Sequence, residues 1–225
     1  MATPLSTALE PIENRYLRDQ AFVRLRDAIV AGRLEPGAPL VISDIAASFE
    51  LSTMPVREAF KRLVGEGLVE ELPRRAHRVA PLTTATALDV LEIVGTLMIR
   101  AYELGVPRLA PADIGAMRAA LDEAQTRATG GDLTGVLACV HRLHSVVYAA
   151  TGNPEFERTI SKIAPRFDRV VYLWYTESLG GVGSSYRRDL VEALEQGRRD
   201  EAVALMRGAW DRFREAISLR RDDDR

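Results

Sequence analysis

Apolar residues recur every three or four positions along most of this chain, the spacing that places them on one face of an α-helix. The first such pattern predicts a helix from about Asp19, a residue type that caps helix starts, to Gly32. A turn is predicted after it at Pro36-Gly37. The expected inner face of this helix comprises Phe22, Leu25, Ile29 and Val30.

Two shorter helices are predicted next, after a small strand within residues 38–42. Ser43 is expected to cap the first of them, and Ser52 or Thr53 is expected to cap the second. Pro55 falls in the first turn of the second helix, where its missing N–H costs nothing. The inward positions of the two helices are Ile45, Ala46 and Phe49, then Val56, Ala59, Phe60 and Leu63.

A β-hairpin with a basic tip is predicted to follow these helices. Its strands are expected at residues 68–72 and 78–81, joined by a turn over 73–77. That turn contains three basic or titratable side chains, Arg74, Arg75 and His77. Short helices followed by such a hairpin are typical of a winged helix-turn-helix.

Beyond Thr83 the pattern changes to long helices separated by breaks rich in glycine and proline. We therefore expect a mainly α protein with a flexible arm over 1–14, a winged helix-turn-helix domain over 15–80 and an all-α helical bundle over 84–220. Within the bundle, helices are expected near 84–104, 111–129, 132–151, 154–178, 184–197 and 199–220.

The composition is that of a globular protein and excludes several classes. Of the 225 residues, 47% are hydrophobic and 28% are charged. No stretch approaches the roughly 20 apolar residues of a membrane span, and residues 1–14 lack the features of a secretory signal. Cys139 is the one cysteine, so no intrachain disulfide forms, and we expect a small buried side chain. A cytoplasmic protein with no membrane partner is expected.

The net charge of each part of the chain is small, so attraction to DNA would depend on local clusters of basic residues. Residues 15–80 hold 11 Lys+Arg against 9 Asp+Glu, a net charge of +2. Residues 81–225 hold 19 against 21, a net charge of −2. The first domain is only mildly basic, so the cluster at the hairpin tip is the feature that would attract DNA.

The third predicted helix and the hairpin tip form a candidate DNA-binding surface. An α-helix fits the major groove of B-DNA, and its first turn reaches base edges. The basic tip is expected along the phosphate backbone or in the minor groove. The alternative is that these are ordinary amphipathic helices with solvated charges. Opposite its apolar stripe, the helix presents Ser52, Thr53, Met54, Arg57, Lys61 and Arg62.

Residues 17–81 resemble the N-terminal domain of the GntR family of bacterial regulators. The matching segments are RLRDAIVAGRLEPGAPL, SDIAASFELSTMPVREAFKRLVGEGLVE and RRAHRVAPL, and the core PVREAFKRLVGEGLV is a highly specific match. The resemblance implies a winged helix-turn-helix that binds a palindromic operator as a homodimer. It places recognition-helix contacts at Ser52, Thr53, Met54 and Arg57, and wing positions at Arg75 and His77.

The chain departs from this family pattern at three positions. Thr53 stands where arginine is usual, Glu50 where a turn glycine is usual, and Ala76 where the wing glycine is usual. Arginine is the strongest single reader of guanine, worth about 1–3 kcal/mol of discrimination, so we expect an atypical operator. A non-glycine residue in a left-handed conformation costs only about 1–2 kcal/mol, so we expect the fold to survive.

The helical part, over roughly residues 84–215, resembles the FadR-like C-terminal ligand-binding domain called FCD. The matching segments are LDVLEIVGTLMIRAYELG, HRLHSVVYAATGNP and YRRDLVEALEQGRRDEAVALMRGAW. The sequence contains no GxSxG, no HExxH and no phosphate-binding glycine loop. Its acidic pairs alternate with arginine, as on solvated helix faces, so we do not expect an enzyme.

Many FCD domains hold a divalent metal with one Asp and three His, and this chain lacks most of that set. His144 stands at the first His position, whereas the Asp position is Val140 and the later His positions are Arg187 and Ala209. One imidazole binds zinc poorly, and His141 does not complete a site. We therefore expect no metal cofactor.

An effector pocket without a metal is the expected outcome of these changes. Positions that usually carry Arg and Glu on the first bundle helix align with Val94 and Met98, which makes the pocket more apolar. Arg187 beside His144, with the hydroxyl of Tyr148, suits a carboxylate on an otherwise apolar molecule. The alternative is that His144 is a hydrogen-bonded core histidine and that Arg187 reaches solvent or pairs with an acid.

The sequence thus predicts a sequence-specific DNA-binding transcription regulator, with repression as the commonest outcome that the resemblance implies. A small organic effector would bias the two DNA-binding domains of a homodimer, and so change the affinity for an inverted-repeat operator in double-stranded DNA. The rival is a helical small-molecule-binding or enzymatic protein whose first domain serves only assembly. That rival predicts no salt-dependent binding to any duplex.

Overall fold

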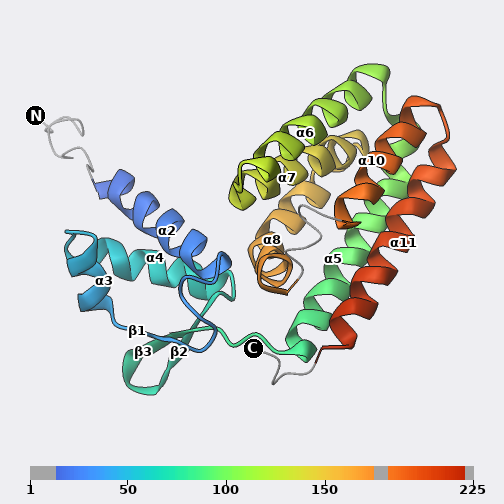
Figure 1. Cartoon of the computed structure of the whole chain (residues 1–225). Helices are drawn as coiled ribbons and strands as arrows, with labels where there is room; N and C mark the ends of the chain where they lie inside the picture. The colour runs from blue at the N-terminus through green and yellow to red at the C-terminus, as the bar shows by residue number, and fades with distance from the viewer. Residues whose placement is uncertain (1–13, 175–181, 221–225) are drawn as a thin grey trace, which may run out of the picture. The chain divides into compact units, whose positions relative to one another are not determined.

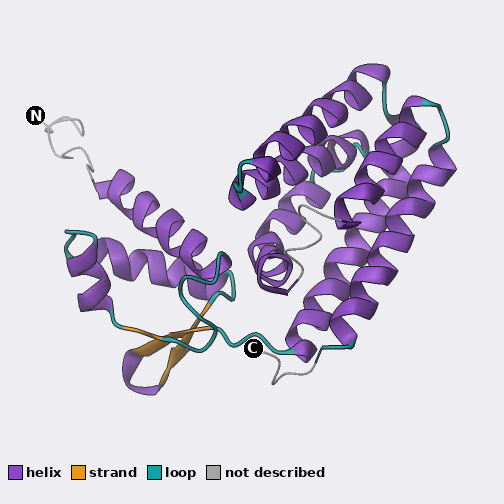
Figure 2. Cartoon of the chain, viewed as in Figure 1, coloured by secondary structure: helices purple, strands orange, loops and turns teal. Residues whose placement is uncertain are grey.

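The computed structural model describes residues 14–174 and 182–220. The chain divides into two compact units, with a boundary between Ala80 and Pro81 and with the short segment Val30–Arg33 grouped with the C-terminal unit. Residues 1–13 of the expected arm lie outside the described residues. Among the described residues, all β-strands belong to the N-terminal unit, and the C-terminal unit is built of helices (Figure 2).

The N-terminal unit has the order of elements of a winged helix-turn-helix (Figure 1). Its three strands form an antiparallel sheet in the order β1-β3-β2, in which Pro39 pairs with Arg78 and Glu71 with His77. The elements are α2 (Asn14–Val30), β1 (Pro39–Leu40), α3 (Ile42–Ser48), α4 (Thr53–Gly65), β2 (Val69–Leu72), η1 (Pro73–Arg75) and β3 (Ala76–Val79).

The core of this unit uses the apolar positions that the sequence pattern predicts. The inward stripe of α4 is almost completely buried, at 0–1% exposure, and the inward stripe of α2 is buried at 0–3% exposure. Burial of this kind is worth about 1.5–3 kcal/mol for a large apolar side chain. The buried set includes Phe22, Leu25 and Ile29 of α2 with Val56, Ala59, Phe60 and Leu63 of α4.

Two of the predicted helix starts are wrong. Helix α2 begins at Asn14, before Asp19, and Asp19 lies on the helix surface, where it pairs with Arg62. Helix α3 begins at Ile42, because the extended backbone of Val41 (φ −105°, ψ 116°) already occupies the N-cap position. Ser43 therefore lies inside α3, and its hydroxyl donates to Asp44 Oδ1 at 3.1 Å.

Among the described residues, two non-glycine residues have a left-handed backbone, and only one of them stands at a position where the family pattern has glycine. Glu50, in the turn between α3 and α4, has φ 56°, as expected where glycine is usual. Ala76 instead has φ −74° and is extended, so it carries no such strain. At the wing, the left-handed residue is Arg74, with φ 62°.

The C-terminal unit is a bundle in which α5 packs against α7, α8 and α11, while α6 packs against α7 and α10 (Figure 1). The predicted helices are present within a few residues of their expected ends, except that residues 175–178 of the fourth lie outside the described residues. The elements are α5 (Thr84–Gly105), η2 (Val106–Arg108), α6 (Pro111–Thr129), α7 (Leu133–Ala150), α8 (Glu155–Trp174), α10 (Val182–Glu195) and α11 (Arg199–Ser218).

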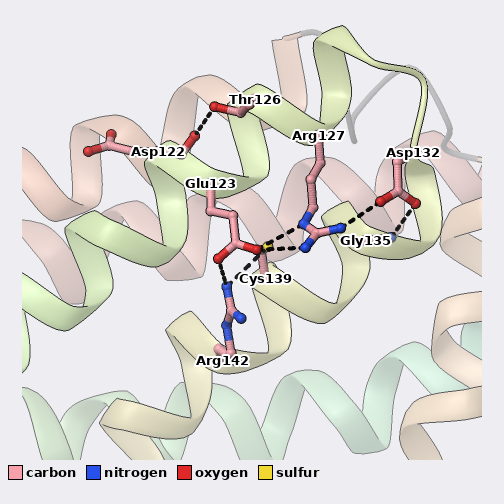
Figure 3. Close-up of polar contacts among 8 residues, drawn as sticks. All are labelled: Asp122, Glu123, Thr126, Arg127, Asp132, Gly135, Cys139 and Arg142. Carbon is pink, nitrogen blue, oxygen red and sulfur yellow. Dashed lines mark hydrogen bonds and ion pairs between the residues drawn. The ribbon is translucent and has the colours of Figure 1, made fainter.

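A network of charged side chains ties α6 to α7 (Figure 3). Arg127 donates to Glu123 at 2.9 and 2.8 Å and to Asp132 at 2.7 Å, and Arg142 of α7 also pairs with Glu123. Asp132 caps α7 by accepting the Gly135 N–H at 2.9 Å. The network therefore fixes the start of α7, the helix that carries His141 and His144.

Helix α7 requires one correction to the expectation about membrane spans. Among the described residues it is long and apolar enough, by length and composition, to cross a membrane. Its apolar residues Val136, Leu143 and Val147 are nevertheless buried in the bundle, as in the core helix of a globular protein. Cys139 on the same helix is 1% exposed, which confirms the expected buried thiol.

Candidate functional site

The exposed face of α4 presents most of the predicted DNA contacts. Ser52 occupies the N-cap position, with an extended backbone (φ −67°, ψ 164°), although its hydroxyl makes no capping hydrogen bond within the described residues. Thr53, Met54 and Arg57 are exposed, and the Met54 side chain is 60% exposed. Pro55 is buried in the first turn of α4, so the start of the helix is fixed while its neighbours face outward.

The two cations at the far end of α4 are exposed, and each also pairs with an acidic side chain of the protein. Lys61 Nζ donates to Glu58 Oε1 at 2.7 Å, and this pair lowers the pKa of the Glu58 carboxyl. Arg62 turns back to Asp19 at 2.6 Å and stacks its guanidinium 3.7 Å from the Phe22 ring centroid. Arg62 is therefore exposed, as the sequence pattern predicted, and it also joins α4 to α2.

Arg57, unlike Lys61 and Arg62, has no acidic partner among the described residues. Within the part of the chain that the structure describes, its guanidinium makes no hydrogen bond or ion pair. It lines a hollow of about 440 Å³ between the start of α4 and strands β1 and β3, together with Thr53 and His77. This arrangement leaves a cation available beside the first turn of α4.

The predicted wing residues Arg74, Arg75 and His77 differ in position and exposure. Arg74 is exposed at the tip, while the Arg75 side chain lies outside the described residues. His77 lies in β3 rather than in the turn, is only half-exposed, and packs edge-on against Phe60 with ring centroids 4.9 Å apart. His77 therefore supports the base of the wing against α4 as well as facing the hollow.

The helical unit contains a cavity of about 250 Å³ between α5, α7, α8, α10 and α11. Its walls are largely apolar, with a few polar groups that converge on it. This is the usual character of a small-molecule site. All five residues that the sequence nominated for effector contact line it: Val94, Met98, His144, Tyr148 and Arg187.

His144 is a buried, hydrogen-bonded imidazole. It is 5% exposed, and its Nδ1 lies 2.7 Å from the Tyr102 hydroxyl of α5. Burial, followed by the positive charges of Arg187 and His141, holds the pKa of His144 well below its usual value, so the ring is neutral. Burial likewise raises the pKa of the Tyr102 and Tyr148 hydroxyls well above the usual value. Neutral hydrogen-bonding groups therefore surround this part of the cavity.

Arg187 supplies a cation to this neutral environment. It is 9% exposed, so it does not extend into solvent, and its guanidinium lies 4.8 Å from the ring centroid of Tyr186. Arg187 and His144 line the same cavity. A buried guanidinium is strongly attractive to a carboxylate because the surrounding dielectric constant is low.

The sequence analysis missed two features of the cavity. One is a polar pair, in which His141 Nε2 lies 2.9 and 3.0 Å from the two carboxylate oxygens of Asp168. The other is an aromatic cluster of Phe167, Trp210 and Phe213, with ring centroids 5.3 to 6.0 Å apart. Trp210 and Phe213 are three residues apart on α11, so they share a helix face, but this spacing does not indicate that the face borders a cavity.

The residues present do not fit the metal of related domains. Val140, Arg187 and Ala209 line the cavity with His144, and none of these three side chains offers a ligand atom to a divalent cation. No group of three or more His, Cys, Asp or Glu side chains within the described residues is arranged to hold a metal. Arg187 thus places a cation of the protein where the resemblance implies a histidine ligand.

Comparisons with known proteins agree with both units. Residues 17–79 match the model for bacterial regulatory proteins of the gntR family, and residues 89–212, more than half of the chain, match the FCD domain. The uncharacterized HTH-type transcriptional regulator BphR of Paraburkholderia xenovorans is 42% identical over 81 residues. That match covers 36% of this chain and 33% of BphR, so the chain spans about a third of this relative.

Two further similarities extend over most of the chain. A probable D-xylose utilization operon transcriptional repressor of Paenarthrobacter nicotinovorans is 27% identical over 193 residues, which are 84% of this chain and 85% of that protein. A crystal structure of a GntR transcriptional regulator from a Rhodococcus species superposes with a TM-score of 0.76 at 24% identity. It covers 91% of this chain and 99% of its own, which supports the fold of both units.

Proposed function

Because the chain belongs to the GntR family of bacterial transcription regulators and carries an FCD domain, we propose that it is a cytoplasmic homodimer that binds an inverted-repeat operator and responds to a small carboxylate. The observation that supports binding of a carboxylate effector is that buried Arg187 and neutral His144 both line a cavity with apolar walls. Effector binding would change operator affinity by favouring one placement of the two DNA-binding domains.

The cavity limits the size and character of the effector. About 250 Å³ lies below the range of about 300–1,000 Å³ that is typical of sites for drug-sized ligands, which favours a metabolite-sized acid. Arg187 would bind its carboxylate, and His144 and Tyr148 would hydrogen-bond it. The cluster of Phe167, Trp210 and Phe213 would cover its apolar body. Repression relieved by this acid is the proposed direction, and the similar repressor of Paenarthrobacter nicotinovorans supports it.

Thermal shift measurements with pairs of small carboxylic acids and their primary amides test the effector proposal. At least one acid is expected to raise the melting temperature of the full chain while its amide does not. Arg187→Gln should abolish that shift, whereas Arg188→Gln, which removes the same charge from an exposed position on α10, should retain it. Equal shifts for acid and amide, or for wild type and Arg187→Gln, would contradict the carboxylate role.

We also propose that the protein needs no metal cofactor. Three of the four ligand positions carry valine, arginine and alanine, and one imidazole binds zinc poorly. Metal analysis of the purified protein is expected to find less than stoichiometric divalent metal. Stoichiometric zinc that His144→Gln removes would overturn this proposal.

The salt dependence of duplex binding distinguishes the proposed function from the rival function, in which the first domain serves only assembly. Phosphate contacts release counterions, so the affinity for a duplex falls steeply with salt concentration. We expect Arg57→Ala to weaken duplex binding by the full chain. Unchanged binding in this variant would show that the assignment of Arg57 as a DNA contact is wrong, whereas no salt-dependent binding in the wild type would favour the rival.

A further inference from the structure

The first turn of α4 presents the methyl groups of Thr53 and Met54 at its exposed surface. We propose that Thr53 and Met54 read thymine through its C5-methyl group, with Arg57 as the cation beside them. This inference rests on the proposed binding of a DNA operator and names the base that the helix selects.

The exposure of the two side chains is the first observation. Thr53 and Met54 are the first two residues of α4, and both are exposed, Met54 to 60%. Pro55 and Val56 after them are buried, so the helix start cannot rotate to hide Met54 in the core. The surface that faces a major groove therefore carries one flexible thioether side chain and one β-branched methyl group.

The second observation concerns the interaction partners of the basic side chains on α4. Lys61 is held by Glu58 at 2.7 Å, and Arg62 is held by Asp19 at 2.6 Å and by the Phe22 ring. Both remain exposed, but each already has an acidic partner within the N-terminal unit. Arg57 has no such partner among the described residues, and it lies one helical turn after Thr53 on the same face.

The chemistry of the major groove connects these observations to one base. Thymine is the base that presents a methyl group there, and apolar side-chain atoms, including the threonine methyl, are its usual contacts. Guanine instead offers two acceptors, which favour arginine or lysine. A first turn with Thr53 and Met54 thus selects thymine, and it leaves Arg57 for a neighbouring guanine or phosphate.

Selection followed by removal of single methyl groups tests this inference. The full chain is used to select duplexes from a random double-stranded library, and each thymine of the enriched half-site is then replaced in turn by deoxyuridine, which lacks only the methyl group. At least one replacement is expected to weaken wild-type binding about fourfold, the effect of exposing one buried methyl. A thymine outside the half-sites serves as the control.

Variants at the exposed positions assign the effect to the side chains. Thr53→Ser with Met54→Gln removes the apolar contacts at surface positions, so the fold should be retained, as circular dichroism can verify. This double variant is expected to bind thymine and deoxyuridine duplexes equally. An enriched half-site in which no deoxyuridine replacement matters, or a penalty that persists in the double variant, would overturn the inference. If no sequence is enriched, the proposed operator binding fails as well.

Discussion

At the scale of single residues, two side chains occupy the left-handed backbone region that favours glycine. Glu50 has φ 56° and is exposed in the turn before α4. Relief of about 1–2 kcal/mol of strain, less about 0.5–1 kcal/mol for the greater freedom of unfolded glycine, predicts that Glu50→Gly stabilises the N-terminal domain by up to about 1.5 kcal/mol. Urea denaturation measures this. Glu50→Ala, which keeps the β-carbon, should show no comparable gain, and equal gains would contradict a backbone origin.

His144 predicts a pH dependence of stability at the same scale. Its folded pKa is depressed below the unfolded value of about 6.5, so the unfolded chain takes up a proton that the folded chain refuses. The contribution to stability is therefore complete above pH 6.5 and declines as pH falls below it, by up to about 1.4 kcal/mol per pH unit. Arg187 and His141 oppose protonation, while Asp168 is hydrogen-bonded to His141.

His144→Gln can still hydrogen-bond Tyr102 but does not titrate. Unfolding free energies of the wild type and this variant, measured by denaturant titration from pH 7 to pH 5, should therefore converge as the solution becomes more acidic. Parallel profiles would show that His144 does not resist protonation in the folded state.

At the scale of elements, the close approach of α5 and α7 positions the polar groups of the cavity. A β-carbon at Gly105 would lie 2.3 Å from the backbone oxygen of Val147, which no real contact tolerates. Gly105→Ala must separate the two helices and so disturb the bond of Tyr102 to His144. We expect a loss of about 1–3 kcal/mol of stability and a weaker thermal shift with the effector acid. Gly115→Ala on α6, where the added β-carbon meets no atom within 4 Å, is the matched control and should stabilise the protein by about 0.5–1 kcal/mol, the usual gain of alanine over glycine in a helix.

The same scale shows why part of the structure could be predicted from the sequence. The stripe of α4 and the five effector residues follow from helical periodicity and from alignment to a known pattern, and both are local properties of the chain. The pairs Arg62–Asp19 and His141–Asp168 join residues 43 and 27 positions apart, so helical periodicity does not reveal them. The false cap at Ser43 has a similar cause, since the backbone of Val41 determines where α3 begins.

At the scale of the whole molecule, the account requires that a ligand in one unit change what the other unit binds. Coupling of this kind is typically about 1–3 kcal/mol, or about 5- to 150-fold in affinity. By linkage, the operator must change the affinity for the acid by the same factor. The effect of the acid on operator binding and the effect of the operator on acid binding must therefore be equal in free energy.

The most direct test is fluorescence anisotropy of a labelled operator duplex, obtained by selection with the full chain, in the presence of the acid and, separately, of its amide. The acid is expected to weaken binding of the wild type by at least about fivefold, while the amide has no effect and Arg187→Gln does not respond to either. An operator affinity that stays the same with every acid that binds the cavity would contradict the account.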